Sequence, residues 1–166
     1  MKIRFLTMVA AVAMLAACAD DTTATNANTG AGNTSKNTVA PAQTGPVKGS
    51  QADFVANVGD RVFFGFDKFD LSTEARGQLG KWVAFLKQYP QDSLVVEGHA
   101  DERGTREYNL ALGERRANSI KDFLVAQGVQ ASRLKVISYG KERPAVLGSN
   151  DAAWAQNRRG VGVVSQ

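Results

Sequence analysis

Apolar and polar positions between residues 60 and 164 follow two different periods along the chain. Short runs rich in aromatic and β-branched residues are typical of strands. Four such runs are RVFFGFD from Arg61, SLVVEG from Ser93, LKVISYG from Leu134 and VGVV from Val161. This part of the pattern therefore predicts four strands.

Segments with helical spacing separate these runs. Ser72 is expected to cap a helix whose apolar side chains recur every three or four residues up to Pro90. A second helix is expected from about residue 107 to 127, with Gly128 as its C-terminal cap. NDAAWAQN, residues 150 to 157, predicts a short third helix. The order β-α-β-α-β-(α)-β favours an α/β (α+β) fold, in which a mixed four-stranded sheet carries helices packed on one face.

Residues 1 to 17 have the pattern of a signal peptide. Two basic residues precede an apolar run that is too short to span a bilayer comfortably. The run ends in LAAC, and Cys18 is the only cysteine of the chain. These four residues resemble a bacterial lipobox, which implies acylation of Cys18; the alternative is a buried thiol that follows a signal sequence. Aspartate directly after such a cysteine resembles an inner-membrane retention signal, and Ala19 at that position favours the outer membrane.

Residues 18 to 50 differ in composition from the rest of the chain. After Cys18 they are mostly Thr, Asn, Ala and Gly. Such a segment cannot bury enough apolar surface to offset the entropy of ordering it, so we expect a disordered tether. Residues 51 to 166 are long enough to form one domain with a real core.

Charge and histidine content exclude several functions. The signal peptide holds two basic residues and no acidic ones, so its removal lowers the formal charge from +4 to +2. A dedicated nucleic-acid binder would show a strong basic patch, and we expect no nucleic-acid partner. His99 is the only histidine, which excludes a multi-histidine zinc centre, and Asp101 and Glu102 are adjacent and make a poor acid-base pair. We therefore expect no catalysis, metal or cofactor, and we expect His99 to be a packed residue at a strand end.

The stretch HADERGTREYNLALGERRA, residues 99 to 117, is unusually rich in charge. Its first part, residues 99 to 106, connects the second predicted strand to the second predicted helix. Residues 67 to 71 form the corresponding first connection. In α/β sheets, ligands commonly sit in the crevice beyond the carboxyl ends of the strands. The two polar loops are therefore expected to share one rim.

The helical wheel of the second helix separates its two adjacent arginines. The apolar stripe consists of Leu110, Gly113, Ala117, Ile120 and Leu124.

Arg115 points away from that stripe into solvent, whereas Arg116 and Asn109 form a polar edge along it. A guanidinium at the core boundary needs an anion. That anion is either Asp101 or Asp70 in a structural ion pair, or the carboxylate of a ligand whose ammonium group binds Asp101. A ligand that bears both charges is an amino acid.

FGFDKFDLSTEA, VEGHADERGTREYNLALGERRAN, SYGKERPAVLG and NRR resemble the family of OmpA-like peptidoglycan-binding domains. The resemblance covers nearly all of residues 60 to 164. It implies non-covalent binding of meso-diaminopimelate in peptidoglycan, with no enzymatic activity. It also assigns six ligand-binding residues, namely Asp101, Arg116, Asn109, Arg103, Phe69 and Asp70.

The resemblance has further implications and some departures. It implies a lipid-anchored protein on the periplasmic face of the outer membrane, in the Tol system, with TolB as a partner whose site overlaps the wall site. Arg106 stands where relatives often have proline, and Trp154 stands where they often have tyrosine. Arg158 and Arg159 are either wall contacts or structural partners of acids at the core edge. A purely structural lipoprotein whose charged loop binds nothing is the remaining alternative.

Overall fold

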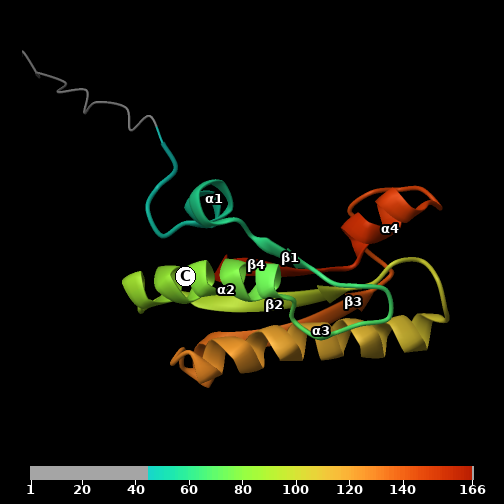
Figure 1. Ribbon diagram of the computed structural model, residues 1–166. Coiled ribbons are helices and arrows are strands. Elements are labelled where there is room, and N and C mark those ends of the chain that lie inside the picture. Colours follow the sequence, from blue (N-terminus) through green and yellow to red (C-terminus); the bar gives the residue numbers. More distant parts are fainter. Residues whose placement is uncertain (1–44, 166) are drawn as a thin grey trace, which may run out of the picture. The chain divides into compact units, whose positions relative to one another are not determined.

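The computed structural model describes residues 45 to 165 (Figure 1). The predicted signal peptide, Cys18 and most of the predicted tether lie outside the described residues. Within the described part of the chain, no helix has both the length and the apolar character that crossing a membrane requires.

The four strands form one mixed sheet, as predicted. They are β1 (Arg61–Phe63), β2 (Ser93–His99), β3 (Leu134–Gly140) and β4 (Arg159–Ser165). Their order is β1-β4-β2-β3, with β2 parallel to β3 and β4 antiparallel to both of its neighbours. The first predicted strand is shorter than its sequence suggested, because the ladder between β1 and β4 ends at Phe63.

Three helices begin at the predicted positions, each with a side-chain cap. They are α2 (Thr73–Gln88), α3 (Arg106–Ala126) and α4 (Asp151–Asn157), capped by Ser72, Thr105 and Asn150. A hydroxyl or amide oxygen at this position satisfies a backbone N–H that the first turn leaves unpaired. Gly128 has a φ of 93°, which fits the predicted glycine after α3.

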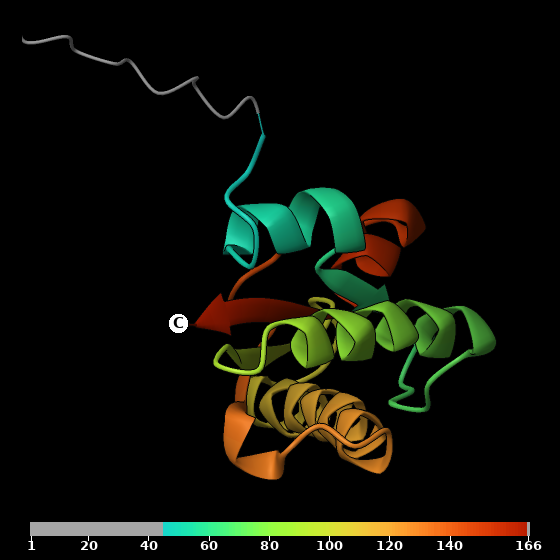
Figure 2. The same ribbon diagram turned by 90° about the vertical axis from the view of Figure 1, so that its left-hand side faces the viewer.

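Helices α2 and α3 run beside each other over one face of the sheet (Figures 1 and 2). Leu94 and Val96 of β2 point into this layer and are fully buried. They join Trp82 of α2 and Ile120 and Leu124 of α3 in a single hydrophobic core. Helix α4 lies at one end of the sheet (Figure 1).

An additional helical segment precedes β1, where the sequence pattern predicted no element. It consists of α1 (Gln51–Asp53) and the π-helical turn η1 (Phe54–Val58). The Gln51 amide accepts from the Val164 backbone at 2.6 Å and donates to the Gly162 carbonyl at 3.5 Å. Gln51 thus provides hydrogen-bond partners for backbone groups of β4 that lie beyond the end of the short β1. Phe54 packs on Trp82 with ring centroids 5.4 Å apart.

Two glycines allow α3 to approach β2 closely. A Cβ atom added to Gly98 would lie 1.8 Å from the Gly113 carbonyl oxygen, and one added to Gly113 would lie 2.8 Å from the Gly98 carbonyl oxygen. Neither backbone can move away without separating the helix from the sheet. This contact therefore fixes the height of α3 above the strand that leads into the charged loop.

We predict that Gly98→Ala destabilises the domain by roughly 3 kcal/mol or more, since the new methyl group overlaps backbone atoms. Gly77→Ala is the matched control. Gly77 lies in α2 with open space around its Cα, so the same change should stabilise the domain by about 0.5 to 1 kcal/mol. Chemical denaturation of both variants measures the difference, and equal stabilities would contradict the close approach.

Candidate functional site

A cavity of about 250 Å³ lies where β2 ends and α3 begins. It is lined by Phe66, Asp67, Asp101, Arg103, Gly104, Tyr108, Asn109, Leu112 and Arg116.

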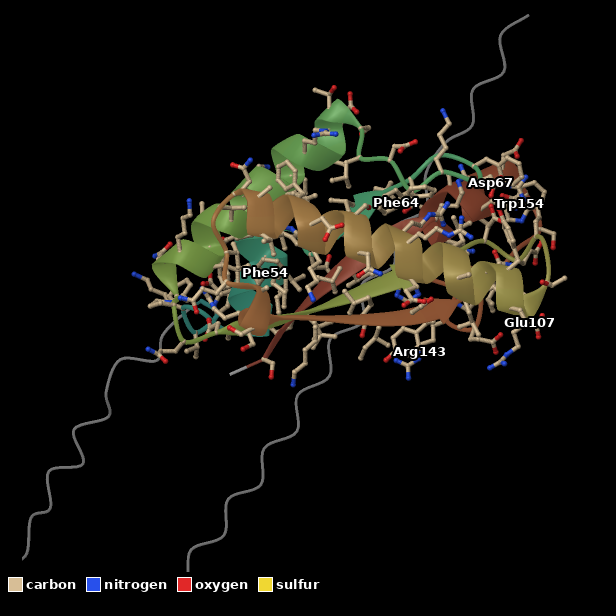
Figure 3. All side chains as sticks on the ribbon, turned by 90° about the horizontal axis from the view of Figure 1, so that it is seen from below. Phe54, Phe64, Asp67, Glu107, Arg143 and Trp154 are labelled. Atoms are coloured by element: carbon tan, nitrogen blue, oxygen red, sulfur yellow. The ribbon has the colours of Figure 1, made fainter. Side chains whose placement is uncertain are left out.

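We name residues 64–72, between β1 and α2, the first loop, and residues 100–105, between β2 and α3, the second loop. Both contribute to the cavity, as the sequence pattern predicted for the two polar connections. Figure 3 shows Asp67 of the first loop and Trp154 of α4 at the same end of the molecule.

Asp67 holds an unusual backbone conformation on the cavity rim. Its φ of 56° makes it the only described residue other than glycine with a positive φ. The Tyr108 hydroxyl, from the first turn of α3, donates a hydrogen bond to its carboxylate. A conformation that costs energy persists only where its surroundings hold it, and here a side chain from another element does so.

Asp101 is almost completely buried, and it already has cationic partners within the chain. Arg103 donates to it through its backbone N–H at 3.1 Å, its Nε at 3.2 Å and its Nη2 at 2.6 Å. Arg158 donates through Nη1 at 3.4 Å. Burial raises the pKa of Asp101, but the hydrogen bonds from Arg103 outweigh it, and the pKa lies below its usual range. The site therefore contains a carboxylate that stays ionised.

Arg116 is fully buried, deeper than the polar edge predicted from the helical wheel. Its Nε donates to the Lys68 carbonyl at 2.8 Å, Nη1 to the His99 carbonyl at 2.8 Å and Nη2 to the Gly65 carbonyl at 3.1 Å. Burial lowers its pKa to about 10, so it remains a cation at neutral pH. Neither Asp101 nor Asp70 forms an ion pair with it, because backbone carbonyls take that place.

Arg103 and Asn109 complete the polar lining. The Arg103 guanidinium lies against two aromatic rings, 4.1 Å from the centroid of Phe66 and 4.1 Å from that of Trp154. The Asn109 amide donates to the Arg103 carbonyl at 2.9 Å and thereby fixes the second loop. The cavity thus combines two carboxylates with two guanidinium groups.

Four of the six ligand-binding residues expected from the sequence meet at this cavity, namely Asp101, Arg103, Asn109 and Arg116. Phe69 and Asp70 lie outside its lining, in a groove between the start of α2 and the C-terminal half of α3. The first loop instead contributes Phe66 and Asp67.

Sequence reasoning also missed Tyr108, although it directly precedes Asn109 and lies one turn before Leu112, near the same end of α3. Asp67 is the last residue of the FGFD motif, but the motif alone does not show that Asp67 lines the cavity. The positive φ at that residue is visible only in the structure.

The two arginines after α4 have internal partners. Besides its contact with Asp101, Arg158 donates to the Phe64 carbonyl at 3.1 Å. Arg159 is buried and donates to the carbonyls of Asn157 at 3.4 Å and Arg143 at 3.1 Å. Both side chains therefore tie the chain after α4 to neighbouring segments.

His99 is buried at the end of β2, where a packed residue was expected. Neither ring nitrogen has a hydrogen-bond partner among the described residues. Its Nε2 lies 3.5 Å from Glu97 Oε2. Burial, followed by the nearby charges of Arg159 and Arg143, lowers its pKa from 6.5 to about 4.

Comparison with known proteins gives concordant matches. The model of the OmpA family matches residues 63–158. A peptidoglycan-associated lipoprotein of Mesorhizobium japonicum is 49% identical over 164 residues, covering 95% of this chain and 90% of the relative. One of Brucella melitensis is 52% identical over 117 residues and covers 70% of each chain.

A solved structure agrees with these matches. The crystal structure of the peptidoglycan-associated lipoprotein from Burkholderia pseudomallei aligns with a TM-score of 0.62 at 40% identity, covering 64% of this chain and 90% of that one. The C-terminal domain of Helicobacter pylori MotB aligns with a TM-score of 0.60 at 18% identity over 64% of this chain and 84% of that one, a likeness of fold alone.

We predict that Arg116→Ala lowers the free energy of unfolding by roughly 3 kcal/mol or more, because it leaves a buried void and removes the donor of three carbonyls, of which that of His99 is buried. Arg115→Ala removes the same side chain from an exposed position one residue away and should change stability little. Urea denaturation of the two variants tests this, and a fully stable Arg116→Ala protein would rule out the structural role of these hydrogen bonds.

The depressed pKa of His99 predicts a stability change in acid. Between pH 6.5 and 4 the unfolded chain binds a proton at this ring and the folded chain does not, so stability falls as the pH falls through this window. The full effect is on the order of 3 kcal/mol. His99→Phe keeps a ring against Tyr139 but cannot titrate, so its stability should fall less steeply over the same range. Parallel slopes for the two proteins would contradict the prediction.

Proposed function

Because the chain belongs to the OmpA family, we propose that it is an outer-membrane lipoprotein that attaches the membrane to the cell wall by binding peptidoglycan non-covalently. Its relatives are lipoproteins rather than enzymes, and the role is a binding role. The observation that carries the proposal is the cavity between the two loops, where two carboxylates and two guanidinium groups surround about 250 Å³.

The ligand proposed for this cavity is the free amino-acid end of meso-diaminopimelate in a peptide stem. That end carries one ammonium and one carboxylate group. Asp67 and Asp101 supply the negative charges of the cavity, and Arg103 and Arg116 supply its positive charges. Hydrogen bonds between charged groups are stronger than neutral ones, so a zwitterion fits this lining better than an apolar or singly charged group of equal size.

The partners already present within the chain refine this proposal. The acceptor sites of Asp101 are used by Arg103 and Arg158, whereas Asp67 is exposed and has its hydrogen bond from Tyr108. The ligand ammonium is therefore expected to lie between Asp67 and Asp101. Arg116 uses three N–H groups on carbonyls, and the two that remain, with the Arg103 guanidinium, are available for the ligand carboxylate.

Energetics favour a reversible anchor. Each charge-assisted contact contributes at most about 1.5 to 3 kcal/mol, and these contacts must offset the entropy of association. A single stem peptide should thus bind with modest affinity. Peptidoglycan presents many stems, and attachment to the membrane keeps the domain near them, so a high effective concentration compensates.

The proposal places the anchor at Cys18, outside the described residues. Acyl chains contribute about 0.8 kcal/mol per buried CH₂, and stable attachment needs more than one chain or a second signal. The residues between Cys18 and the domain would act as the tether. As a member of the Tol-Pal system, the protein would serve envelope integrity and cell division, and TolB would compete with the wall for the same end of the domain.

We predict that Asp101→Asn weakens binding of a diaminopimelate-containing muropeptide at least tenfold, since it removes one charge from the cavity. Asp122→Asn makes the same change at an exposed position of α3 outside the cavity and should bind as the unaltered protein does. Isothermal titration calorimetry measures both, with melting temperatures recorded beside them.

A muropeptide that carries lysine in place of diaminopimelate is the ligand control, because lysine lacks the second carboxylate. It should bind much more weakly than the diaminopimelate form. Equal binding of the two muropeptides, or undiminished binding by a folded Asp101→Asn variant, would defeat the proposal.

A further inference from the structure

The Arg103 side chain is held from three directions at the rim of the cavity. The rings of Phe66 and Trp154 both contact its guanidinium, each with its centroid 4.1 Å from Cζ. Asp101 binds one edge of the guanidinium through Nε and Nη2. A flexible side chain that is 34% exposed is thereby confined to one orientation.

Trp154 is itself fixed to the second loop by a hydrogen bond. Its indole Nε1 donates to Glu102 Oε1 at 3.0 Å, and Glu102 directly precedes Arg103. This bond also lowers the pKa of Glu102, after the larger effect of a hydrogen bond from Ser149. Lys141 reinforces the same loop, because its Nζ donates to the Gly104 carbonyl at 2.7 Å. Helix α4 and the segment before it thus hold the second loop in place.

We propose that Trp154 is a positioning residue for wall binding that acts through Arg103. The inference rests on the proposed function, since it concerns the same cavity. With two aromatic rings against the guanidinium and one edge on Asp101, the N–H groups that remain keep a fixed direction before any ligand arrives. A ligand carboxylate then meets an ordered donor, and less entropy is lost on binding. In this proposal Trp154 does not contact the ligand itself.

The location of Trp154 allows the idea to be tested without unfolding the domain. The residue is half-buried on a short helix at one end of the sheet, and it is not part of the hydrophobic core. A stacked cation contributes about 1 kcal/mol, which corresponds to about a fivefold change in affinity. Trp154→Ala should therefore weaken muropeptide binding about fivefold with little change in melting temperature, while Trp154→Phe, which keeps an aromatic face, should retain most of the affinity.

Leu147→Ala is the matched control, because Leu147 is a large apolar side chain on the preceding loop that is 86% exposed and does not line the cavity. It should bind as the unaltered protein does. The Nε–Hε resonance of Arg103 in ¹⁵N-edited NMR gives a second measurement. It should shift in Trp154→Ala because the indole ring current is lost, and it should stay in place in Leu147→Ala.

A double-mutant cycle decides whether Trp154 acts through Arg103. In an Arg103→Ala background, Trp154→Ala should cause no further loss of muropeptide affinity, since the group it orients is absent. An additive loss would show an independent role and overturn the proposal, as would unchanged or tighter binding by Trp154→Ala alone. Failure of the unaltered protein to bind the muropeptide would instead overturn the proposed function, and the inference with it.

Discussion

The geometry of the site depends on one buried cation. Arg116 contributes its guanidinium from α3 and receives no carboxylate in return, only the carbonyls of Gly65, Lys68 and His99. Those carbonyls belong to the first loop and to the end of β2. A buried charge must be satisfied or it destabilises the fold. Arg116 therefore helps to hold the first loop in place, and the loop in this position forms part of the cavity lining.

The position of Arg116 depends in turn on a close backbone contact between two glycines. Gly98 and Gly113 bring α3 onto β2 so closely that neither position has room for a methyl group. A helix held farther from the sheet would carry Arg116 and Asn109 away from the two loops. The hydrophobic core, with Leu94, Val96 and Ile120, stabilises this arrangement, but the two glycines set the distance. The close packing of α3 on β2 thus determines where the Arg116 guanidinium lies.

Most elements were predictable from the sequence because their signals are local. Hydrophobic spacing and capping residues such as Ser72 act over one or two turns, and the structure confirms those helices. Helix α1 was missed because the contact that favours it is not local. Gln51 accepts a hydrogen bond from the backbone of Val164 in β4, more than a hundred residues later in the sequence. The helical wheel gave the direction of Arg116 but not its carbonyl partners. It placed the residue at an edge, whereas the side chain is fully buried. Likewise, the order of residues in the first loop could not show that the positive φ of Asp67 brings Phe66 and Asp67 to the cavity.

Two of the four charges that line the cavity, Asp101 and Arg103, are paired with each other before a ligand arrives, and this bears on how tightly the site can bind. Asp101 shares its acceptors between Arg103 and Arg158, so an ammonium group that approaches it replaces existing hydrogen bonds rather than satisfying an empty carboxylate. The net gain of such an exchange is the difference between two similar interactions, and it is small by comparison with either one. The same pairing spares the domain an unpaired buried charge when no ligand is bound. A site of this kind is stable when empty and releases its ligand readily, and strong attachment then requires many sites on one polymer.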